Sequence, residues 1–595
     1  MTKGLELERA ELLLRPNALT VLRERYLLRD DEGRVTETPE EAIDRCARHV
    51  AAAEEAFVPG SSERWSEEFA RAMRSLLFLP NSPTLMNAGT RLGLLSGCFV
   101  LPVEDSLESI FSTLKDMALI QQAGGGTGFS FSELRPKGDL VASTHNVATG
   151  PVSFLRLFDM TADVVKQGGR RRGANMGMLA VTHPDVEEFV AAKAQDGTLE
   201  NFNLSLAVPD SFMRAAEEDG AHRLVNPRTG ETTQELRARD LFERIAEQAH
   251  ATGDPGLVFV DRINRDNAVP TVGRIEATNP CGEVPLLPNE SCNLGSLNLA
   301  RLAADGDVDW ELLRATVRLL TRFLDDVIDV NRYPTPEVER ATRATRKIGV
   351  GVMGLAELLA ELGIPYDSDE AIELASSIAR TVRDEATRAS EELAAERGPF
   401  PLFEESVFGR NGSPPRRNAQ LVALAPTGTI SIIAGTTSGI EPMFALAYTR
   451  NVLGTRLVEV SPVFERVARE RSFYSDELVR EVELSGGVRA NVRVPDDVRR
   501  VFATALEVAP EWHLRMQAAF QRFTDAAVSK TINLPASASV EDVKAIYLDA
   551  WRADLKGITI YRYGSKESQV LTVAGGGVEV GPAYAGGCAD FACEV

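Results

Sequence analysis

Hydrophobic positions in the first part of the chain recur at helical spacing. After Pro39, which suits the start of a helix, Ile43, Cys46 and Val50 fall on one face at i, i+3 and i+7. Residues 1 to about 75 are therefore predicted to form a helical region. Because Cys46 lies on the apolar face, it is predicted to be an inert core residue rather than a reactive thiol.

From about Phe78 the pattern changes to short apolar runs that are separated by glycines. The run 98–103 is predicted as a strand, and a helix from about 106 to 122 follows it. The glycine-rich segment 124–128 then precedes a short strand at 129–131. Since strands and helices alternate along most of the chain, the default prediction is a largely parallel sheet or barrel wrapped by helices.

Two long helices and a glycine-rich tail complete the pattern. The helices are predicted at about 309–330 and 372–397. After Val570 the periodic apolar pattern stops, and glycine-rich sequence leads to Cys588 and Cys593. Such sequence is typical of a flexible arm, which here carries two thiols.

The composition is acidic and otherwise ordinary for a globular protein. The 595 residues include 65 Lys and Arg against 87 Asp and Glu, a formal net charge of -22. A nucleic-acid polymer needs a broad basic face, so such a partner is not expected, although a small anion is not excluded. The sequence shows no signal core and no long apolar run, so we expect no membrane span and a cytoplasmic protein. Six cysteines in so long a chain do not suggest a disulfide scaffold.

The segment Asn279-Pro280-Cys281-Gly282-Glu283 places an amide, a thiol and a carboxylate at alternate positions, with Cys292 eleven residues after the first cysteine. Pro280 and Gly282 do not suit a regular helix, so an irregular loop buried among other elements is favoured. In an extended, strand-like loop, alternate side chains lie on one side, so three reactive groups are predicted to face one space. The alternative is a zinc knuckle or a core cysteine. A zinc site is disfavoured because the spacing is not CxxC or CxxH and no histidine lies nearby, so no metal site is expected.

Three further stretches are candidates for anion or nucleotide contact. Residues 424–433 have the composition of a strand-to-helix turn, which suits either an anion site or an ordinary helix N-cap. Residues 349–354 match GxGxxG, but the strand before them is short, so a dinucleotide site is disfavoured. Residues 166–175 combine glycines with three arginines, which favours a nucleotide contact over a solvated charge run.

Taken together, these stretches resemble the catalytic subunit of ribonucleotide reductase, most closely the adenosylcobalamin-dependent class II. The resemblance runs from about residue 17 to 570. It rests on several motifs in the family's order, at 79–90 (LPNSPTLMNAGT), 124–129 (GGGTGF), 167–176 (QGGRRRGANM), 279–283 (NPCGE), 426–430 (PTGTI) and 561–565 (YRYGS).

The resemblance implies an α/β fold, a ten-stranded barrel whose central finger loop is residues 279–283. The implied organisation is a helical region at 1–75, the barrel at 76–570 and a flexible redox tail at 571–595. The family often carries an N-terminal ATP cone that sets overall activity. Because the match to the leading helices of the barrel begins almost at once, no such cone is expected.

The resemblance also implies roles for the reactive side chains. Cys281 becomes a thiyl radical that abstracts the 3′ hydrogen of the ribose, Glu283 takes the proton of the 3′-hydroxyl, and Asn279 hydrogen-bonds the sugar. Cys98 and Cys292 supply two electrons and end as a disulfide, with Cys98 as proton donor to the leaving 2′-hydroxyl. Cys588 and Cys593 re-reduce this pair and exchange with a thioredoxin-type reductant.

Binding sites follow from the same resemblance. The ribonucleotide substrate is expected at Ser82, Gly97, Cys98, Gly126, Asn279, Pro280, Cys281, Gly282, Glu283, Pro426, Thr427, Gly428, Thr429 and Ile430. A deoxynucleotide or ATP effector is expected at a homodimer interface near Asp105, Ser106, Lys137, Arg170, Arg171 and Arg172. The arginine loop would then connect the effector to the substrate base.

The radical source is expected to be adenosylcobalamin. Class I enzymes receive their radical through two adjacent tyrosines, whereas here Arg562 separates Tyr561 from Tyr563, which matches the class II pattern more nearly. The class II pattern usually has an acid where Tyr563 stands. The alternatives are a class I subunit that needs a metal-bearing partner, a NAD-dependent dehydrogenase and a non-catalytic nucleotide sensor. Diphosphates are the expected substrates, although triphosphates would use the same phosphate loop.

Overall fold

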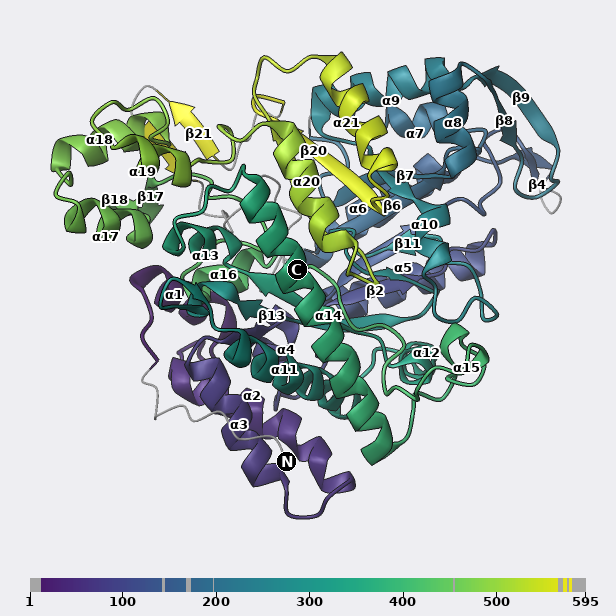
Figure 1. The fold of residues 1–595 in the computed structure, drawn as a ribbon. Coiled ribbons are helices and arrows are strands. Elements are labelled where there is room, and N and C mark those ends of the chain that lie inside the picture. The colour runs from purple at the N-terminus through teal and green to yellow at the C-terminus, as the bar shows by residue number, and fades with distance from the viewer. Residues whose placement is uncertain are drawn as a thin grey trace.

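The computed structural model of the chain describes residues 12–141, 145–166, 173–195, 197–452, 455–565, 571–574 and 577–580. Helices come first, at the purple end of the chain in Figure 1, with α2 (Pro39–Ala51) packed on α3 (Ser62–Arg74). Thr38 caps α2 in a capping box with Glu41. Cys46 is fully buried on the apolar face of α2, which confirms the prediction of a core cysteine.

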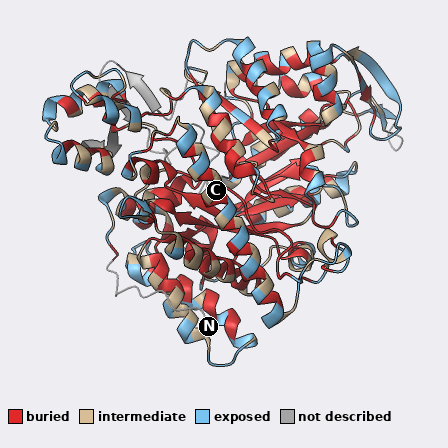
Figure 2. Cartoon of the chain, viewed as in Figure 1, coloured by how far each residue is buried: buried red, intermediate tan, exposed pale blue. Residues whose placement is uncertain are grey.

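Ten strands form one sheet at the centre of the molecule. Its order is β1-β13-β2-β3-β6-β7-β10-β20-β19, with β16 also paired to β13. The strands are β1 (Phe78–Pro80), β2 (Cys98–Leu101), β3 (Gly126–Ser130), β6 (Asn175–Ala180), β7 (Phe202–Val208), β10 (Gly256–Phe259), β13 (Ser291–Asn298), β16 (Ile348–Met353), β19 (Thr531–Leu534) and β20 (Gly557–Arg562). Buried residues concentrate in these strands (Figure 2).

The strands run in two parallel groups that meet antiparallel. One group runs from β2 through β3, β6 and β7 to β10. The other contains β13 with β16 and β19 with β20, and the groups join where β13 meets β2 and where β20 meets β10. Residues 421–425 lie between β16 and the chain just before β19. Val422 pairs in parallel with Val350 of β16, and Leu424 pairs in parallel with Val528. The sheet therefore closes into the predicted α/β barrel.

Long amphipathic helices cover the outside of this barrel. Their buried faces are turned toward the strands and their exposed faces toward solvent (Figures 1 and 2). The main ones are α5 (Leu107–Gln122), α6 (Pro151–Lys166), α9 (Ala238–Thr252), α11 (Trp310–Val330), α14 (Asp369–Arg397), α20 (Pro510–Gln521) and α21 (Val540–Arg552). The two long helices predicted from sequence correspond to α11 and α14. Among the described residues, no helix combines the length and apolar character needed to cross a membrane.

In two glycine-rich stretches, several of the glycines lie inside strands; at 349–354 this agrees with the expectation that no dinucleotide site forms there. The strand expected at 129–131 is β3, which begins already at Gly126. A Cβ on Gly128 would lie 1.8 Å from the carbonyl oxygen of Thr278, so this glycine lets the chain before the finger loop cross the strand. The GxGxxG match at 349–354 lies mostly inside β16, where a Cβ on Gly349 would lie 2.1 Å from Leu294. These glycines allow close packing in the barrel, and they do not form a dinucleotide-binding turn.

Candidate active site

The finger loop enters the barrel and makes a tight turn. Gly282 has a φ of 81°, which glycine adopts without strain, and its N–H donates to the carbonyl oxygen of Asn279 at 3.0 Å. The loop is held on its far side by the N–H of Ala527, which donates to the carbonyl oxygen of Glu283 at 2.8 Å. The expectation of an extended segment is therefore wrong, because the chain reverses at Gly282.

This turn brings the first and last side chains of the motif into contact. Asn279 donates through Nδ2 to Glu283 Oε2 at 2.7 Å and to Cys98 Sγ at 3.2 Å. Its Oδ1 accepts from the N–H of Val284 at 2.9 Å, which fixes the orientation of the amide. Cys98 Sγ lies 4.0 Å from Glu283 Oε1. An amide, a carboxylate and a thiol from two distant segments thus share one buried space.

Cys98 and Cys292 lie directly opposite each other on β2 and β13. Residues in such positions have Cα atoms about 4.5–5.5 Å apart, which is a separation that a disulfide can span. Both side chains are fully buried, and both are thiols in this structure. The position of this pair beside the finger loop agrees with its expected role.

Burial dominates the proton affinities of this cluster. It raises the pKa of Glu283 to about 7, against the opposing effect of the hydrogen bond from Asn279. Burial also raises the pKa of Cys98 well above its usual value, and the nearby Glu283, Cys292 and Cys281 raise it further. Near neutral pH, both cysteines of the pair are therefore protonated thiols, while Glu283 is divided between its acid and base forms.

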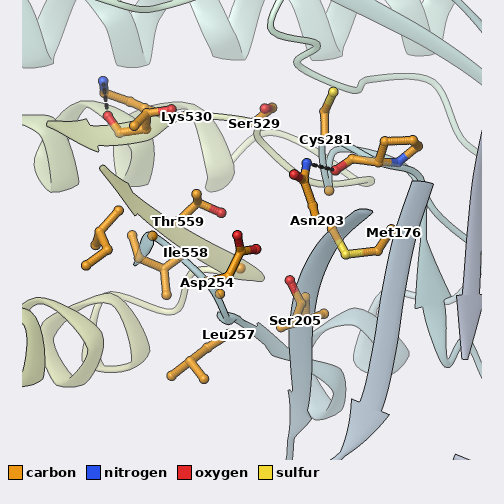
Figure 3. A pocket seen from close by; sticks show the side chains of 18 of the residues that line it. Met176, Asn203, Ser205, Asp254, Leu257, Cys281, Ser529, Lys530, Ile558 and Thr559 are labelled. Atoms are coloured by element: carbon orange, nitrogen blue, oxygen red, sulfur yellow. Dashed lines mark hydrogen bonds between the residues drawn. The ribbon is translucent and has the colours of Figure 1, made fainter. Parts of the chain in front are cut away.

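Cys281 stands at the tip of the turn and is half-buried. It lines a pocket between the finger loop and strands β7, β10 and β20. In Figure 3, Cys281 lies next to Asn203, whose Nδ2 donates to the carbonyl oxygen of Pro280 at 2.9 Å, and Ser205 and Asp254 line the pocket farther from the loop. Cys281 also acts electrostatically on Cys98, so it lies between this pocket and the buried thiol pair.

The predicted phosphate turn has the expected strand-to-helix form. Thr427 adopts a φ of 56° and caps α16 (Gly428–Ala434), and its Oγ1 accepts from the N–H of Gly439 at 2.8 Å. The Thr429 hydroxyl is buried and has no hydrogen-bond partner among the described residues. A buried hydroxyl without a partner is costly unless a ligand or water satisfies it, so this turn is suited to bind a polar ligand.

The other expected substrate residues lie on both sides of Cys98. Gly97 precedes it and donates its N–H to the carbonyl oxygen of Cys292 at 3.1 Å, and Gly126 pairs with Cys98 across β2 and β3. Ser82 is buried, and its hydroxyl is 2.7 Å from that of Tyr26 on the N-terminal π-helix Leu22–Tyr26. The sequence motifs gave no signal for this contact from Tyr26.

The expected effector residues that the structure describes lie together at one corner. Ser106 caps α5, and Asp105 pairs with Arg135 Nε at 2.8 Å, two residues before Lys137. Lys137 is exposed and lies 3.1 Å from Glu188. The expected arginines Arg170, Arg171 and Arg172, and the tail cysteines Cys588 and Cys593, lie outside the described residues.

Sequence reasoning missed a buried ion pair beside Cys292. Lys347 Nζ lies 2.6 Å from Glu290 Oε2, and each side chain is only 3% exposed. A signal was present, because Glu290 stands two residues before Cys292 and alternate residues of a strand share a face. Lys347, in contrast, comes from a distant segment. Among the described residues, no group of three or more His, Cys, Asp or Glu side chains could hold a metal ion.

Comparisons with known proteins agree on one family. Residues 12–93 match "Ribonucleotide reductase, all-alpha domain", and residues 96–414 and 408–561 match "Ribonucleotide reductase, barrel domain". The vitamin B12-dependent ribonucleoside-diphosphate reductase of Mycobacterium tuberculosis is 62% identical over 590 residues, which cover 98% of this chain and 85% of that protein.

Two further comparisons extend this agreement. The protein of the same name from Thermoplasma acidophilum is 47% identical over 620 residues, covering 94% of this chain and 80% of that one. Among solved structures, the class Id ribonucleotide reductase alpha subunit of Actinobacillus ureae superposes with a TM-score of 0.75 at 25% identity. It covers 94% of this chain and 99% of its own.

Proposed function

Because this chain belongs to the ribonucleotide reductase family, we propose that it is an adenosylcobalamin-dependent enzyme that reduces ribonucleotides to 2′-deoxyribonucleotides. The observation that carries the proposal is the convergence of Asn279, Glu283 and two opposed thiols beside a finger loop with Cys281 at its tip. Relatives named as B12-dependent reductases align over nearly the whole chain. Arg562 between the two tyrosines favours this class over class I.

Each side chain of the finger loop has one task in this reaction. Cys281 holds the unpaired electron as a thiyl radical and takes the 3′ hydrogen atom of the ribose. Glu283 removes the proton of the 3′-hydroxyl, and Asn279 orients both the carboxylate and the sugar. A carboxylate with a pKa of about 7 suits this work, because a general base is most effective when its pKa lies near the working pH.

The thiol pair supplies the reducing equivalents. Cys98, a neutral thiol beside Glu283 and Asn279, donates a proton to the leaving 2′-hydroxyl, which departs as water. Cys98 and Cys292 then give up two electrons and form a disulfide across β2 and β13. Cys588 and Cys593 would return the pair to thiols and in turn receive electrons from a thioredoxin-type protein.

The pocket beside Cys281 is proposed to receive the adenosyl arm of adenosylcobalamin. Asn203, Ser205 and Thr559 line it and offer polar atoms suited to a nucleoside. The chemistry that the cofactor supplies when bound is a radical, from homolysis of its cobalt–carbon bond. The protein's part is to hold Cys281 at the edge of this pocket, which the hydrogen bond from Asn203 to the finger loop does.

The Thr427 to Ile430 turn is proposed to bind the phosphates of the substrate. The unsatisfied Thr429 hydroxyl and the backbone N–H groups at the start of α16 would meet phosphate oxygens. Diphosphates are the proposed substrates. The test is to incubate the purified chain with adenosylcobalamin, a dithiol and either CDP or CTP, and to measure deoxynucleotide. Faster turnover of CDP would support the proposal, and a clear preference for CTP would contradict it.

The activity is expected to depend on the ionisation of Glu283. The base form is required, and burial raises its pKa to about 7, so kcat/KM should rise with pH and level off above 7. At pH 6 it should be roughly a tenth of the plateau value. Glu283→Gln should lower activity by at least about 10²-fold and remove this rise. A rise that persists in the Gln variant would mean that another group is the base.

A homodimer is proposed from an apolar surface on α5 and α6, which pack side by side. Phe111 on α5 is 51% exposed and Met160 on α6 is 67% exposed, and Leu107, Leu119 and Val164 on the same helices are also exposed. Contiguous apolar surface of this kind marks a protein–protein contact. The corner formed by Asp105, Ser106 and Lys137 adjoins α5, so a nucleotide effector bound there would lie at the dimer interface.

Charged residues on this surface should separate the dimer. Phe111→Glu combined with Met160→Glu places like charges in the apolar contact and is expected to give a monomer by sedimentation, at concentrations where the wild type is a dimer. Leu484→Glu is the matched control, because Leu484 is 53% exposed on a different part of the molecule. A wild-type monomer, or a double variant that remains dimeric, would rule out this interface.

A further inference from the structure

The two thiols of the active-site pair lie in different surroundings. Cys98 faces the finger loop, where Asn279 Nδ2 donates to its sulfur at 3.2 Å and Glu283 Oε1 lies at 4.0 Å. In the part of the chain that the structure describes, the Cys292 sulfur has neither of these contacts, and its thiol donates to the carbonyl oxygen of Asn293 at 3.5 Å.

The Lys347–Glu290 ion pair belongs to the surroundings of Cys292. The parallel register of β13 and β16 pairs Asn293 with Ile348, so the preceding residues, Cys292 and Lys347, are neighbours across the strands. Glu290 stands two residues before Cys292, just ahead of β13, and its charge acts on the Cys292 thiol. The carboxylate of Glu290 is held further by the N–H of Leu287 and the hydroxyl of Thr345, each at 2.7 Å.

Such a pair is costly to bury, because two charges lose their hydration. Its place beside one of two otherwise similar thiols suggests a role in distinguishing them. We propose that the Lys347–Glu290 pair makes Cys292 the leaving sulfur, so that an incoming thiol opens the Cys98–Cys292 disulfide by attack on Cys98. In this scheme Lys347 is a positioning residue that acts through Cys292. The inference rests on the proposed function, which supplies the disulfide.

The charges around each sulfur support this direction. After burial, the largest effect on the Cys292 thiol comes from Lys347, which lowers its pKa, while Glu283, Glu290 and Asp525 each raise it by less. Each charged or ionisable group that acts on Cys98, namely Glu283, Cys292 and Cys281, raises its pKa, and only the hydrogen bond from Asn279 lowers it. A thiolate on Cys292 would thus lie beside a cation, whereas a thiolate on Cys98 would lie beside the carboxylate of Glu283. The sulfur whose surroundings better stabilise negative charge leaves faster.

The exchange balances in two steps. The incoming thiolate forms a bond to the Cys98 sulfur while the Cys98–Cys292 bond breaks, and the electron pair of that bond leaves on Cys292 as a thiolate beside Lys347. A second thiolate then attacks the incoming sulfur of the mixed disulfide and releases Cys98. Two thiols are oxidised and one disulfide is reduced, and protons from the incoming thiols return both cysteines to thiols.

The test identifies which cysteine receives the incoming thiol. The full chain carrying Cys588→Ser and Cys593→Ser is oxidised with diamide to form the Cys98–Cys292 disulfide and is treated briefly with the monothiol cysteamine. Alkylation then traps the mixed disulfide for peptide mapping. The expected result is cysteamine on Cys98 and the alkyl group on Cys292. An even distribution, an excess of cysteamine on Cys292, or failure of the disulfide to form would overturn the inference.

Two double variants, each of which replaces one lysine–carboxylate pair by neutral side chains, distinguish the effect of the Lys347 charge from a general disturbance of the fold. Lys347→Gln with Glu290→Gln should shift the Cys98 to Cys292 ratio toward even, by about tenfold. The control is Lys556→Gln with Asp266→Asn, a second lysine pair at 2.7 Å, in which a buried lysine meets an exposed carboxylate in a pocket that Lys347 also lines. It should leave the ratio unchanged. An unchanged ratio in the first variant would contradict the role of Lys347.

Chemical oxidation keeps this test independent of turnover. If the chain makes no deoxynucleotide but cysteamine still adds to Cys98, the proposed function fails and the inference about Cys292 stands. If deoxynucleotide is made but cysteamine adds to Cys292, the function stands and the inference fails.

Discussion

Replacing Cys281 with serine is expected to abolish deoxynucleotide formation, lowering kcat by at least about 10⁴-fold. An O–H bond is stronger than an S–H bond, so a serine oxygen at this position cannot take up and hold the unpaired electron. The substitution is nearly isosteric, and the half-buried side chain stands at the tip of the turn. The turn itself depends on Gly282 and on the hydrogen bond between Asn279 and Glu283, so the fold should be preserved.

The measurement is product formation, accompanied by nucleotide binding and thermal unfolding. Binding and unfolding should match the wild type, which separates loss of chemistry from loss of structure. Cys46→Ser is the matched control, because Cys46 is a fully buried thiol outside the active site. It should remain active. Activity of Cys281→Ser above about a hundredth of the wild-type value would mean that the radical is held elsewhere.

The second large effect is expected at the thiol pair. Cys98→Ala and Cys292→Ala should each reduce multiple-turnover activity by at least about 10³-fold, and the double variant should be no worse, because the two sulfurs act as a unit. Either substitution removes the partner needed for the disulfide across β2 and β13. Cys46→Ala again serves as the control.

A single-turnover experiment gives this prediction a direct readout. Without an external reductant, the chain carrying Cys588→Ser and Cys593→Ser should yield about one product for each active-site pair oxidised, because no tail thiols remain to reduce that pair again. Peptide mapping should then find a Cys98–Cys292 disulfide and an unmodified Cys281. A disulfide that includes Cys281 would contradict the assignment, because the radical thiol must stay out of such bonds.

Much of the fold was predictable because its signals are local. The periodicity around Ile43 and Val50 gave the helix α2, and the run after Gly97 gave β2. The order of motifs gave the barrel. Errors arose where long-range packing overrides local pattern. The glycines at 126 and 128 lie within β3 because the chain before the finger loop crosses there, a contact between segments about 150 residues apart in sequence.

In the active site, too, the features set by local sequence were predicted and those set by long-range packing were not. The sequence alone predicted that Asn279, Cys281 and Glu283 belong to one site, because they are neighbours in the chain. The family resemblance added Cys98 and Cys292 to that site. The sequence predicted an extended segment, whereas the positive φ of Gly282 turns the chain and lets Asn279 reach Glu283. The contact of Lys347 with Glu290 and the pocket beside Cys281 arise from strand pairing between distant segments. No sequence motif signals either the ion pair or the pocket, so neither could be predicted from the sequence.

The most direct test of the account is deoxynucleotide formation by the purified chain alone, with a dithiol, an effector and CDP, in the presence and absence of adenosylcobalamin. The account predicts dCDP only when the cofactor is added, with no second protein required. Product that appears without the cofactor, or only after addition of a separate metal-bearing subunit, would contradict it.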